Sequence, residues 1–378
     1  MKARRFEQIF DKIKQLRVGV IGDFAVDFYI DIQTTTGEIS IETQQEVHWG
    51  KNPKTSLGAA GNVVQNVHAL GVAKIQVFGY TGHDIFGREM RYMLHSLGVN
   101  TDGLLAIPQA DTCTYTKPLQ KGIEQNRLDF GTNNRIKNAD FEAIIQQLVA
   151  VLPQLDVVLV NQQFPNPLLT PARIAQLNDL IQQFPDVLFV ADLRDFGNAI
   201  RGATLKVNTA ELGRMLGLDP IENSQEWCST QAEILQNIIQ APVLVTRGER
   251  GLLYTTNPPR RSAPPLPRGD NPTWAVSSQP STSDLFVETQ TTGIPLSSDE
   301  ERGRGEVNLC IEDGYALTGP LDTVGAGDTV LAAFAVTKAV EASPQEALQI
   351  ANAAAAVTVQ KLHQTGTATP QEIRHILL

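Results

Sequence analysis

The residues of this chain best suited to chemistry are Gly325, Ala326, Gly327 and Asp328. They stand at the start of a segment rich in small apolar residues, which predicts a helix after Asp328 that runs to about Ala342. Backbone N–H groups of the first three residues can point at one anion, where the helix dipole adds positive potential. A carboxylate beside that anion can take the proton of a hydroxyl that attacks a phosphoryl group. The segment therefore favours phosphoryl transfer, although Gly-x-Gly before a helix is also common in ordinary turns.

A second pair of polar residues, Asn208 and Glu211, follows a predicted strand at 205–207. Three residues apart on the first turn of a helix, they can share one face, and the carboxylate can orient Mg²⁺ through water. Helix capping is the ordinary explanation of this spacing.

A third group of residues suits a phosphorylated ligand. Thr246, Arg247, Gly248 and Gly251 end another predicted strand, where glycines let the backbone approach a ligand and a hydroxyl can bind phosphate. We expect Arg247 near the phosphates. Asn352 lies in an alanine-rich segment that predicts a helix. A tight turn and close helix packing are the respective alternatives.

The N-terminal half supplies residues for an acceptor. Asp23 and Asp27 follow the first predicted strand, at the edge where open α/β sheets bind ligands, and Asp27 is the better candidate for sugar hydroxyls. Gly58 and Asn62 open a helix with exposed backbone and an amide that both donates and accepts, or else Asn62 caps that helix. No Gly-x-Gly-x-x-Gly follows the first strand, which argues against a dinucleotide site.

Short apolar runs alternate with helical patterns, so the elements that position these residues are predicted to be βαβ units around a largely parallel sheet. Capping boxes at Ser343 and Thr369 predict two C-terminal helices, the first of which runs to about Leu362. The predicted central strands are rich in Val, Ile and Leu, and lie at Arg17–Gly22, Ile75–Gly79, Val157–Val160, Val187–Asp192 and Val243–Thr246.

Two regions depart from this pattern. Residues 31–50 alternate polar and apolar side chains, which predicts a small exposed sheet that segments within 113–130 complete. Residues 257–305 are rich in Pro, Ser and Thr and are predicted to be a long loop inserted into a hairpin of 252–255 with 307–311. A solvated insertion is favoured over a partner-docking polyproline segment.

Composition limits the class of protein. With 378 residues, 42% of them apolar, the chain can bury a large core, and no apolar run of about 18 residues predicts a membrane span. A net charge of −10 argues against binding nucleic acid or an anionic membrane. The N-terminus lacks the apolar core of a signal peptide, and three distant cysteines fit neither disulfides nor a metal cluster, so we expect a cytoplasmic protein.

The string from Asp322 to Asp328, in order after Asn-x-x-Glu and the glycine turn, resembles the signature of ribokinase-like sugar kinases of the PfkB type. The resemblance covers nearly the whole chain, 1–378, outside the insertion. It implies a doubly wound, mostly parallel α/β sheet with helices on both faces and a small β lid. It also implies that Asp328 is the catalytic base, that 325–327 form the anion hole, and that ATP and Mg²⁺ are the cofactors, with Mg²⁺ at Glu211. By the same resemblance, the turn of 246–251 binds the nucleotide, and the small residues around Asn352 let the purine lie close.

Within that family the resemblance is strongest to bacterial heptose 7-phosphate kinases, the kinase half of ADP-heptose synthesis enzymes. Departures in the lid and after a central strand remove two cations that could hold a phosphorylated sugar, so an unrelated sugar stays open as acceptor. The remaining candidates for a phosphate are Lys117, Lys121, Arg127 and Arg194. Because the chain ends soon after the last expected helix, the resemblance implies a separate kinase. The segments on which it rests are Val20–Asp27, Asn126–Phe130, Arg201–Leu205, Leu244–Arg247, Asp322–Val330 and Ala351–Val357.

The resemblance further implies a homodimer formed through the lid and a monovalent cation, K⁺, at Asp322 and Thr323, where a plain Asx-turn is the alternative. Two other functions remain open at this point. A non-catalytic sugar or nucleotide sensor would have no need of a base such as Asp328. A nucleoside kinase would need aromatic stacking residues, for which Trp49 and Tyr115 are available.

Overall fold

The computed structural model describes residues 1–256, 308–362 and 366–378. Residues 1–256 and 309–378 form one compact unit. The predicted inserted loop, 257–305, lies outside the described residues, and so does Val307 at the start of the predicted return strand.

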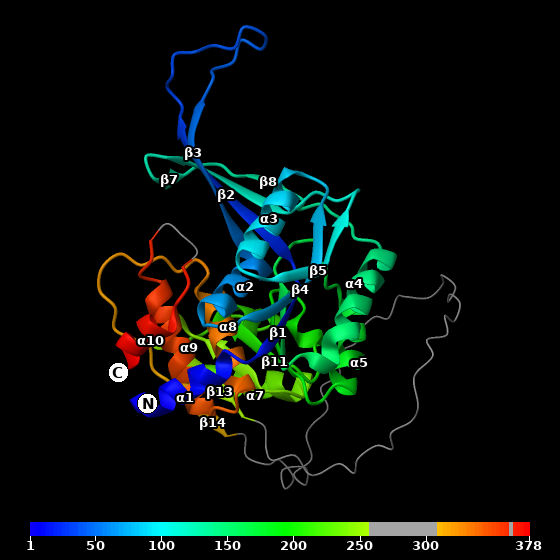
Figure 1. The fold of residues 1–378 in the computed structure, drawn as a ribbon. Helices are drawn as coiled ribbons and strands as arrows, with labels where there is room; N and C mark the ends of the chain where they lie inside the picture. Colours follow the sequence, from blue (N-terminus) through cyan, green and yellow to red (C-terminus); the bar gives the residue numbers. More distant parts are fainter. Residues whose placement is uncertain (257–307, 363–365) are drawn as a thin grey trace. The chain divides into compact units, whose positions relative to one another are not determined.

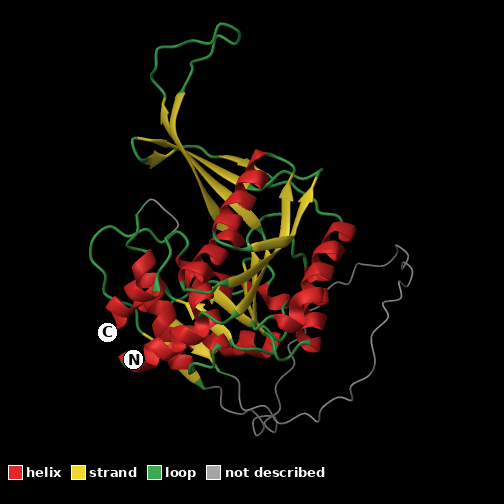
Figure 2. Ribbon diagram, viewed as in Figure 1, coloured by secondary structure: helices red, strands yellow, loops and turns green. Residues whose placement is uncertain are grey.

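Nine strands of the described residues form one sheet in the order β14-β13-β12-β11-β10-β9-β1-β4-β5 (Figures 1 and 2). All neighbouring pairs are parallel except β12–β13 and β13–β14, and Val20 of β1 stands between Val77 of β4 and Leu159 of β9. The strands are β1 (Arg17–Gly22), β4 (Lys74–Gly82), β5 (Asn100–Ile107), β9 (Val157–Gln162), β10 (Leu188–Leu193), β11 (Thr204–Asn208), β12 (Val243–Thr246), β13 (Leu252–Thr255) and β14 (Leu309–Glu312).

Helices cover both faces of this sheet, because successive strand residues point to opposite sides. Val157 and Leu159 pack into one apolar cluster, and Val158 and Val160 pack into the other. The first cluster includes residues of α1 (Ala3–Ile13), α2 (Ala60–Ala69), α3 (Ile85–Ser96), α8 (Ala326–Ala339), α9 (Pro344–Thr358) and α10 (Pro370–Leu377). The second includes residues of α4 (Asn138–Val151), α5 (Pro171–Gln183), α6 (Thr209–Met215) and α7 (Gln225–Ile239). This is the predicted doubly wound α/β fold.

A second sheet of five strands projects from the main one, and we call it the lid (Figure 1). Its central strand β2 pairs antiparallel with β3 and parallel with β6, and β6 also pairs with β7 and β8. The strands are β2 (Phe24–Gln33), β3 (Trp49–Ala59), β6 (Thr114–Gln120), β7 (Ile123–Glu124) and β8 (Leu128–Phe130). Short 3-10 turns connect other elements at η1 (Leu152–Gln154), η2 (Gly197–Ala199) and η3 (Gly248–Arg250).

The prediction that residues 31–50 alternate as strands is wrong over 34–48. That segment is a loop with one isolated bridge between Ile39 and Glu46, because its polar residues have no apolar face to bury. The capping boxes at Ser343 and Thr369 are confirmed, although α8 ends at Ala339 and α9 at Thr358, earlier than predicted. No helix among the described residues has the length and apolarity needed to span a membrane.

Candidate active site

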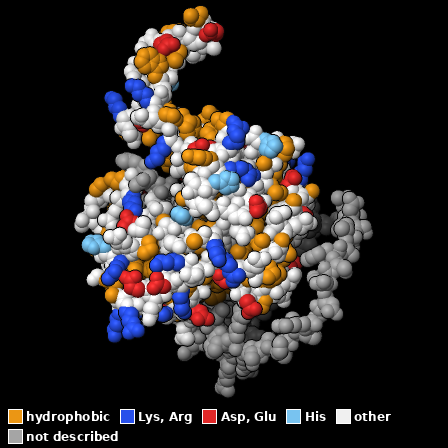
Figure 3. Space-filling view, viewed as in Figure 1, with side chains coloured by type: hydrophobic (Ala, Val, Ile, Leu, Met, Phe, Trp, Pro, Cys, Tyr) orange, Lys and Arg blue, Asp and Glu red, His pale blue; other side chains and the backbone are white. Residues whose placement is uncertain are grey.

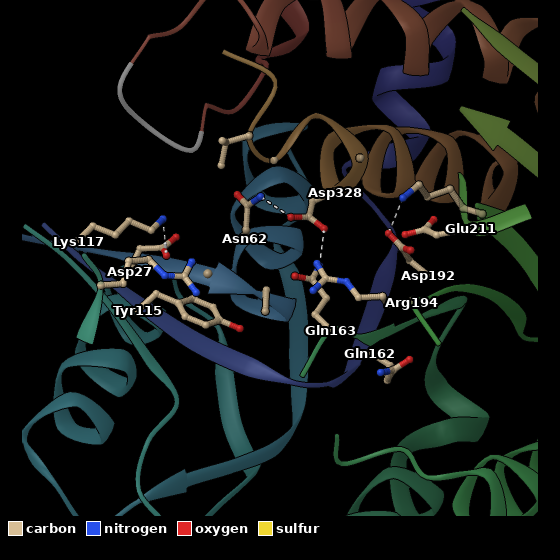
Figure 4. A pocket seen from close by; sticks show the side chains of 17 residues that line it. Asp27, Asn62, Tyr115, Lys117, Gln162, Gln163, Asp192, Arg194, Glu211 and Asp328 are labelled. Carbon is tan, nitrogen blue, oxygen red and sulfur yellow. Dashed lines mark hydrogen bonds and ion pairs between the residues drawn. The ribbon is translucent and has the colours of Figure 1, made fainter. Parts of the chain in front are cut away.

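A cavity of about 360 Å³ lies where the carboxyl ends of the central strands meet the N-terminus of α8 and the base of the lid (Figure 4). We call it the acceptor cavity. Nine predicted site residues line it, namely Asp27, Gly58, Asn62, Lys117, Arg127, Glu211, Gly325, Gly327 and Asp328. Residues that are up to 301 positions apart in the sequence are brought together here because parallel strands end at one edge.

Asp328 lies between two amide side chains (Figure 4). Asn62 Nδ2 donates to Asp328 Oδ2 at 2.7 Å, and Gln163 Nε2 donates to Oδ1 at 3.1 Å. Burial and the charge of Asp192 raise the pKa of Asp328 to about 6, against the hydrogen bond from Asn62. The carboxylate is therefore ionised at neutral pH and is a stronger proton acceptor than a free Asp.

The first turn of α8 has the conformation that the glycines permit. Gly325 is the N-cap residue with φ of 79°, a left-handed conformation that favours glycine. Of the three predicted anion-hole amides, that of Ala326 donates to Thr323 O at 3.2 Å. Gly325 and Gly327 face the acceptor cavity.

Four cations line the acceptor cavity, and three of them, Lys117, Arg127 and Arg194, are candidates from the sequence for binding a phosphate. Lys117 Nζ lies 2.8 Å from Asp27 Oδ1, and Arg127 Nη2 lies 2.7 Å from Asp129 Oδ2. The guanidinium of Arg127 also covers the ring of Tyr115, 4.9 Å from its centroid. The side chain of Arg194 also lines the cavity, and no carboxylate of a described residue forms an ion pair with it. Arg194 is therefore the best placed of the three to bind an anionic group of a ligand.

The assignment of Asp23 as an acceptor ligand is wrong. Its side chain has no exposed surface, and its two oxygens accept hydrogen bonds from the backbone N–H groups of Gln163, Phe164 and Leu168 at 2.8 to 2.9 Å. Burial raises its pKa to about 6. Asp23 holds the loop after β9 in place, and thereby positions Gln163.

A second cavity, of about 830 Å³, lies on the other side of the first turn of α8. We call it the nucleotide cavity. The predicted residues that line it are Thr246, Gly248, Gly251, Thr323, Ala326, Gly327 and Asn352. Gly327 lines both cavities, so they adjoin at the start of α8.

The two glycines of the turn after β12 have different reasons to be glycine. Gly248 has φ of 61° and open space where a side chain would start. A Cβ on Gly251 would lie 2.1 Å from Glu312 O, so this glycine is required by its own hairpin. The amide of Asn352 donates to Asp313 O at 2.7 Å and holds the segment after β14.

Three residues predicted to bind a ligand line neither cavity, and each makes a hydrogen bond within the protein. Arg247 is buried, and its Nη2 donates to Asn223 O at 3.3 Å, which corrects its expected place beside phosphates. Asn208 caps α6, because its Oδ1 accepts from Glu211 N while Glu211 Oε2 accepts from Asn208 N, both at 2.8 Å. Asp322 Oδ1 accepts from Val324 N at 3.0 Å, which is the Asx-turn alternative.

Four residues of the acceptor cavity had no place in the sequence-based site. Lys206 Nζ lies 2.7 Å from Asp192 Oδ2, and both side chains are buried beside Glu211. Gln162 is the last residue of β9, and Gln163 follows it. A signal for two of them exists, because a lysine and an aspartate in strands of otherwise apolar residues are unusual. Within the described residues, no group of three or more His, Cys, Asp or Glu side chains could hold a metal ion.

Comparison with known proteins agrees with this geometry. A family model described as pfkB family carbohydrate kinase matches residues 17–270 and 316–372. The bifunctional protein HldE of Desulfatibacillum aliphaticivorans is 26% identical over 354 residues, which are 93% of this chain and 61% of that protein. HldE of Vibrio parahaemolyticus is 27% identical over 94% of this chain and 61% of its own length. The chain thus spans about three fifths of these curated relatives.

Solved structures support the fold. Arabidopsis thaliana ribokinase, solved with ribose and ATP, has a TM-score of 0.63 at 19% identity, over 96% of this chain and 98% of that one. Phosphofructokinase-2 of Escherichia coli, solved with potassium, has a TM-score of 0.65 at 15% identity over the same shares. The family model covers most of the chain, all residues that line the acceptor cavity and most of those that line the nucleotide cavity, and the chain therefore belongs to the pfkB family of carbohydrate kinases.

Proposed function

We propose that this protein transfers the γ-phosphoryl group of ATP to a hydroxyl of a sugar or sugar phosphate. The observation that supports this most directly is the position of Asp328 in the acceptor cavity, one residue after the glycine that lines both cavities. A hydroxyl in the acceptor cavity and a terminal phosphate in the nucleotide cavity would meet at the first turn of α8, which is the arrangement that in-line transfer needs.

Asp328 is the proposed general base. Its two amide donors, Asn62 and Gln163, hold the carboxylate in one orientation and leave further lone pairs on each oxygen for an acceptor hydroxyl. With a pKa of about 6 the group is ionised at pH 7 and accepts the proton as the O–P bond forms.

Charge on the transferring group is proposed to be stabilised by the free N–H groups of the first turn of α8 and by the dipole of this helix of 14 residues. The residues present also fit Mg²⁺ held mainly by ATP, because Glu211 faces the cavity and Asn208 N occupies only its Oε2. Bound there through water, Mg²⁺ would neutralise phosphate charge.

A phosphorylated acceptor is favoured over a neutral sugar by Arg194, whose guanidinium lines the cavity without a carboxylate partner among the described residues. The sequence resemblance makes heptose 7-phosphate the first compound to test. Adenosine is a weaker candidate because Arg127 already covers the ring of Tyr115, and Trp49 donates its indole N–H to Glu38 outside the cavity.

The test is ADP release with Mg-ATP across heptose 7-phosphate, fructose, ribose, hexose phosphates and adenosine, with Asp328→Asn as the blank. Turnover on a phosphorylated sugar that disappears in the variant is the expected result. Turnover on adenosine alone, or turnover that persists in the variant, would reject the proposal.

Two further proposals concern assembly and ions. A homodimer through the lid is supported by apolar side chains on that sheet and its loops, among them Ile41, Trp49, Ile123 and Leu128, which are 47–86% exposed (Figure 3). Light scattering of the wild type and of Ile123→Lys tests it, with a monomeric wild type as the contrary result.

A K⁺ site near Thr323 predicts faster turnover in KCl than in NaCl, and equal rates in the two salts would reject this site.

A further inference from the structure

Lys206 is a buried lysine that the proposed mechanism has not used. It is the third residue of β11, 5% exposed, and its Nζ lies 2.7 Å from Asp192 Oδ2 at the end of β10. An ammonium group has three hydrogens, and this ion pair engages one of them. The side chain lines the acceptor cavity, so the ammonium borders open space.

The ammonium lies against the first turn of α8. A Cβ built on Gly327 would stand 3.0 Å from Lys206 Nζ and 3.7 Å from its Cε. Gly327 is the residue that lines both cavities, so Lys206 reaches the place where they adjoin. A side chain on Gly327, in the first turn of α8, would require the ammonium to shift by a few tenths of an ångström.

The surroundings keep Lys206 charged. Burial opposes the charge, but Asp192 and Glu211 outweigh it and raise the pKa of the lysine. The carboxylate of Asp328 also acts on Lys206 through its charge. A permanent cation with hydrogens to donate thus stands in the acceptor cavity beside Gly327, the residue that lines both cavities.

We propose that Lys206 is a catalytic residue that binds the phosphoryl group while it passes from ATP to the acceptor, with Asp192 as the residue that positions it. This inference rests on the proposed function. The bond from phosphorus to the β-phosphate oxygen breaks and its electrons leave with ADP, the acceptor oxygen bonds to phosphorus, and the acceptor proton goes to Asp328. Lys206 keeps its protons throughout and stabilises the negative charge of the phosphoryl oxygens.

The competing explanation is that Lys206 only neutralises Asp192. The double variant Lys206→Met with Asp192→Asn separates the two, because it removes both charges with little change in volume. Lys206→Met alone would leave a buried unpaired carboxylate and is expected to fold poorly. Asp192→Asn keeps the lysine and a hydrogen-bond acceptor for it, while Glu211 still raises the pKa of the lysine, and this variant is the matched control.

If Lys206 binds the phosphoryl group, the double variant loses about 10²-fold or more in kcat, as when one preorganised donor is removed. Asp192→Asn stays within about tenfold of the wild type, and the KM for ATP changes little in either. Rates are compared at pH 8.5, where Asp328 should be ionised in all three proteins, because the charge of Asp192 raises the pKa of Asp328 and that of Lys206 lowers it. A double variant with wild-type kcat, or with a loss no larger than that of Asp192→Asn, would overturn the proposal.

A binding measurement separates this proposal from the choice of acceptor. Calorimetry gives the affinity for MgADP with and without tetrafluoroaluminate, which mimics a phosphoryl group in transfer. We expect a gain in affinity in the wild type that the double variant lacks. If the wild type shows this gain but phosphorylates no acceptor in the panel, the proposed acceptor class is rejected and the role of Lys206 stands. If the gain in affinity is equal in the two proteins, or absent from both, the proposed role of Lys206 is rejected.

Discussion

The two cavities that adjoin at Gly327 are built from different kinds of residue. The acceptor cavity is lined mainly by charged and amide side chains, whereas the nucleotide cavity is lined mainly by glycine, alanine and other small or apolar residues. Binding in the acceptor cavity therefore depends on individual polar atoms, whereas binding in the nucleotide cavity depends on the shape of its walls. Substitutions that change charge at constant volume should act in the acceptor cavity, and those that change volume at constant charge should act in the nucleotide cavity.

The largest effect is expected from Asp328→Asn, which changes charge and almost nothing else. Loss of a general base should lower kcat by ~10²–10⁴-fold and leave the affinity for ATP nearly unchanged. ADP release measures the first quantity and calorimetry with MgATP the second. Near-normal turnover would mean that the base lies elsewhere, and the contrast between the two cavities would lose its main support.

Arg194→Gln tests the choice of acceptor. Loss of one charged hydrogen bond to a phosphate should raise the KM for a sugar phosphate by roughly 10–100-fold, while the KM for ATP stays within about twofold. Arg127→Gln is the matched control, because Asp129 and Tyr115 already engage that guanidinium and its loss should matter less. A larger effect from Arg127 would reverse the assignment.

Ala355→Leu fills the nucleotide cavity without any change of charge. Ala355 lines this cavity from α9, and three added carbon atoms should raise the KM for ATP by about tenfold through overlap with the ligand. Initial rates at varied ATP measure the effect, and the KM for the acceptor should not move. Ala355→Ser adds one small atom and should resemble the wild type; an equal loss in both variants would mean that the added volume does not determine the effect.

Glu211→Gln should act more weakly, through Mg²⁺. Glutamine keeps an oxygen for the N–H of Asn208, so the capping box and α6 should persist. Loss of the negative charge should raise the Mg²⁺ concentration for half-maximal rate by a few-fold, roughly the effect of one charge that acts through water. A magnesium titration at saturating ATP measures it, and an unchanged midpoint would exclude Glu211.

Features that depend on local sequence patterns could be predicted, whereas features that depend on contacts between distant residues could not. The central strands, the capping boxes and the Gly-Ala-Gly-Asp turn depend on local patterns, and the doubly wound fold follows from them. Lys206 and Gln163 could not be assigned a role, because each acts only through residues distant in the chain. The prediction that Asp23 binds the acceptor is wrong for the same reason. A carboxylate after a strand has the same sequence signal whether it faces a ligand or accepts hydrogen bonds from three buried N–H groups.

The smallest effect concerns stability, and it again singles out Asp328. Its folded pKa of about 6 lies above the ordinary 3.8, so the ionised carboxylate costs the folded state free energy above pH 6, and that cost is relieved as pH falls through 6. Asp328→Asn removes the cost but also leaves one amide donor without its acceptor at every pH. The stability of the variant relative to the wild type, compared between pH 8 and pH 4.5, therefore reports the effect of the charge alone. In denaturant unfolding we expect Asp328→Asn to gain stability relative to the wild type on going from pH 4.5 to pH 8, on the order of 1 kcal/mol or more. Asp186→Asn, at an exposed position before β10, should show no such change in stability relative to the wild type between the two pH values. If both variants show the same change, ionisation of Asp328 does not cost the folded state free energy.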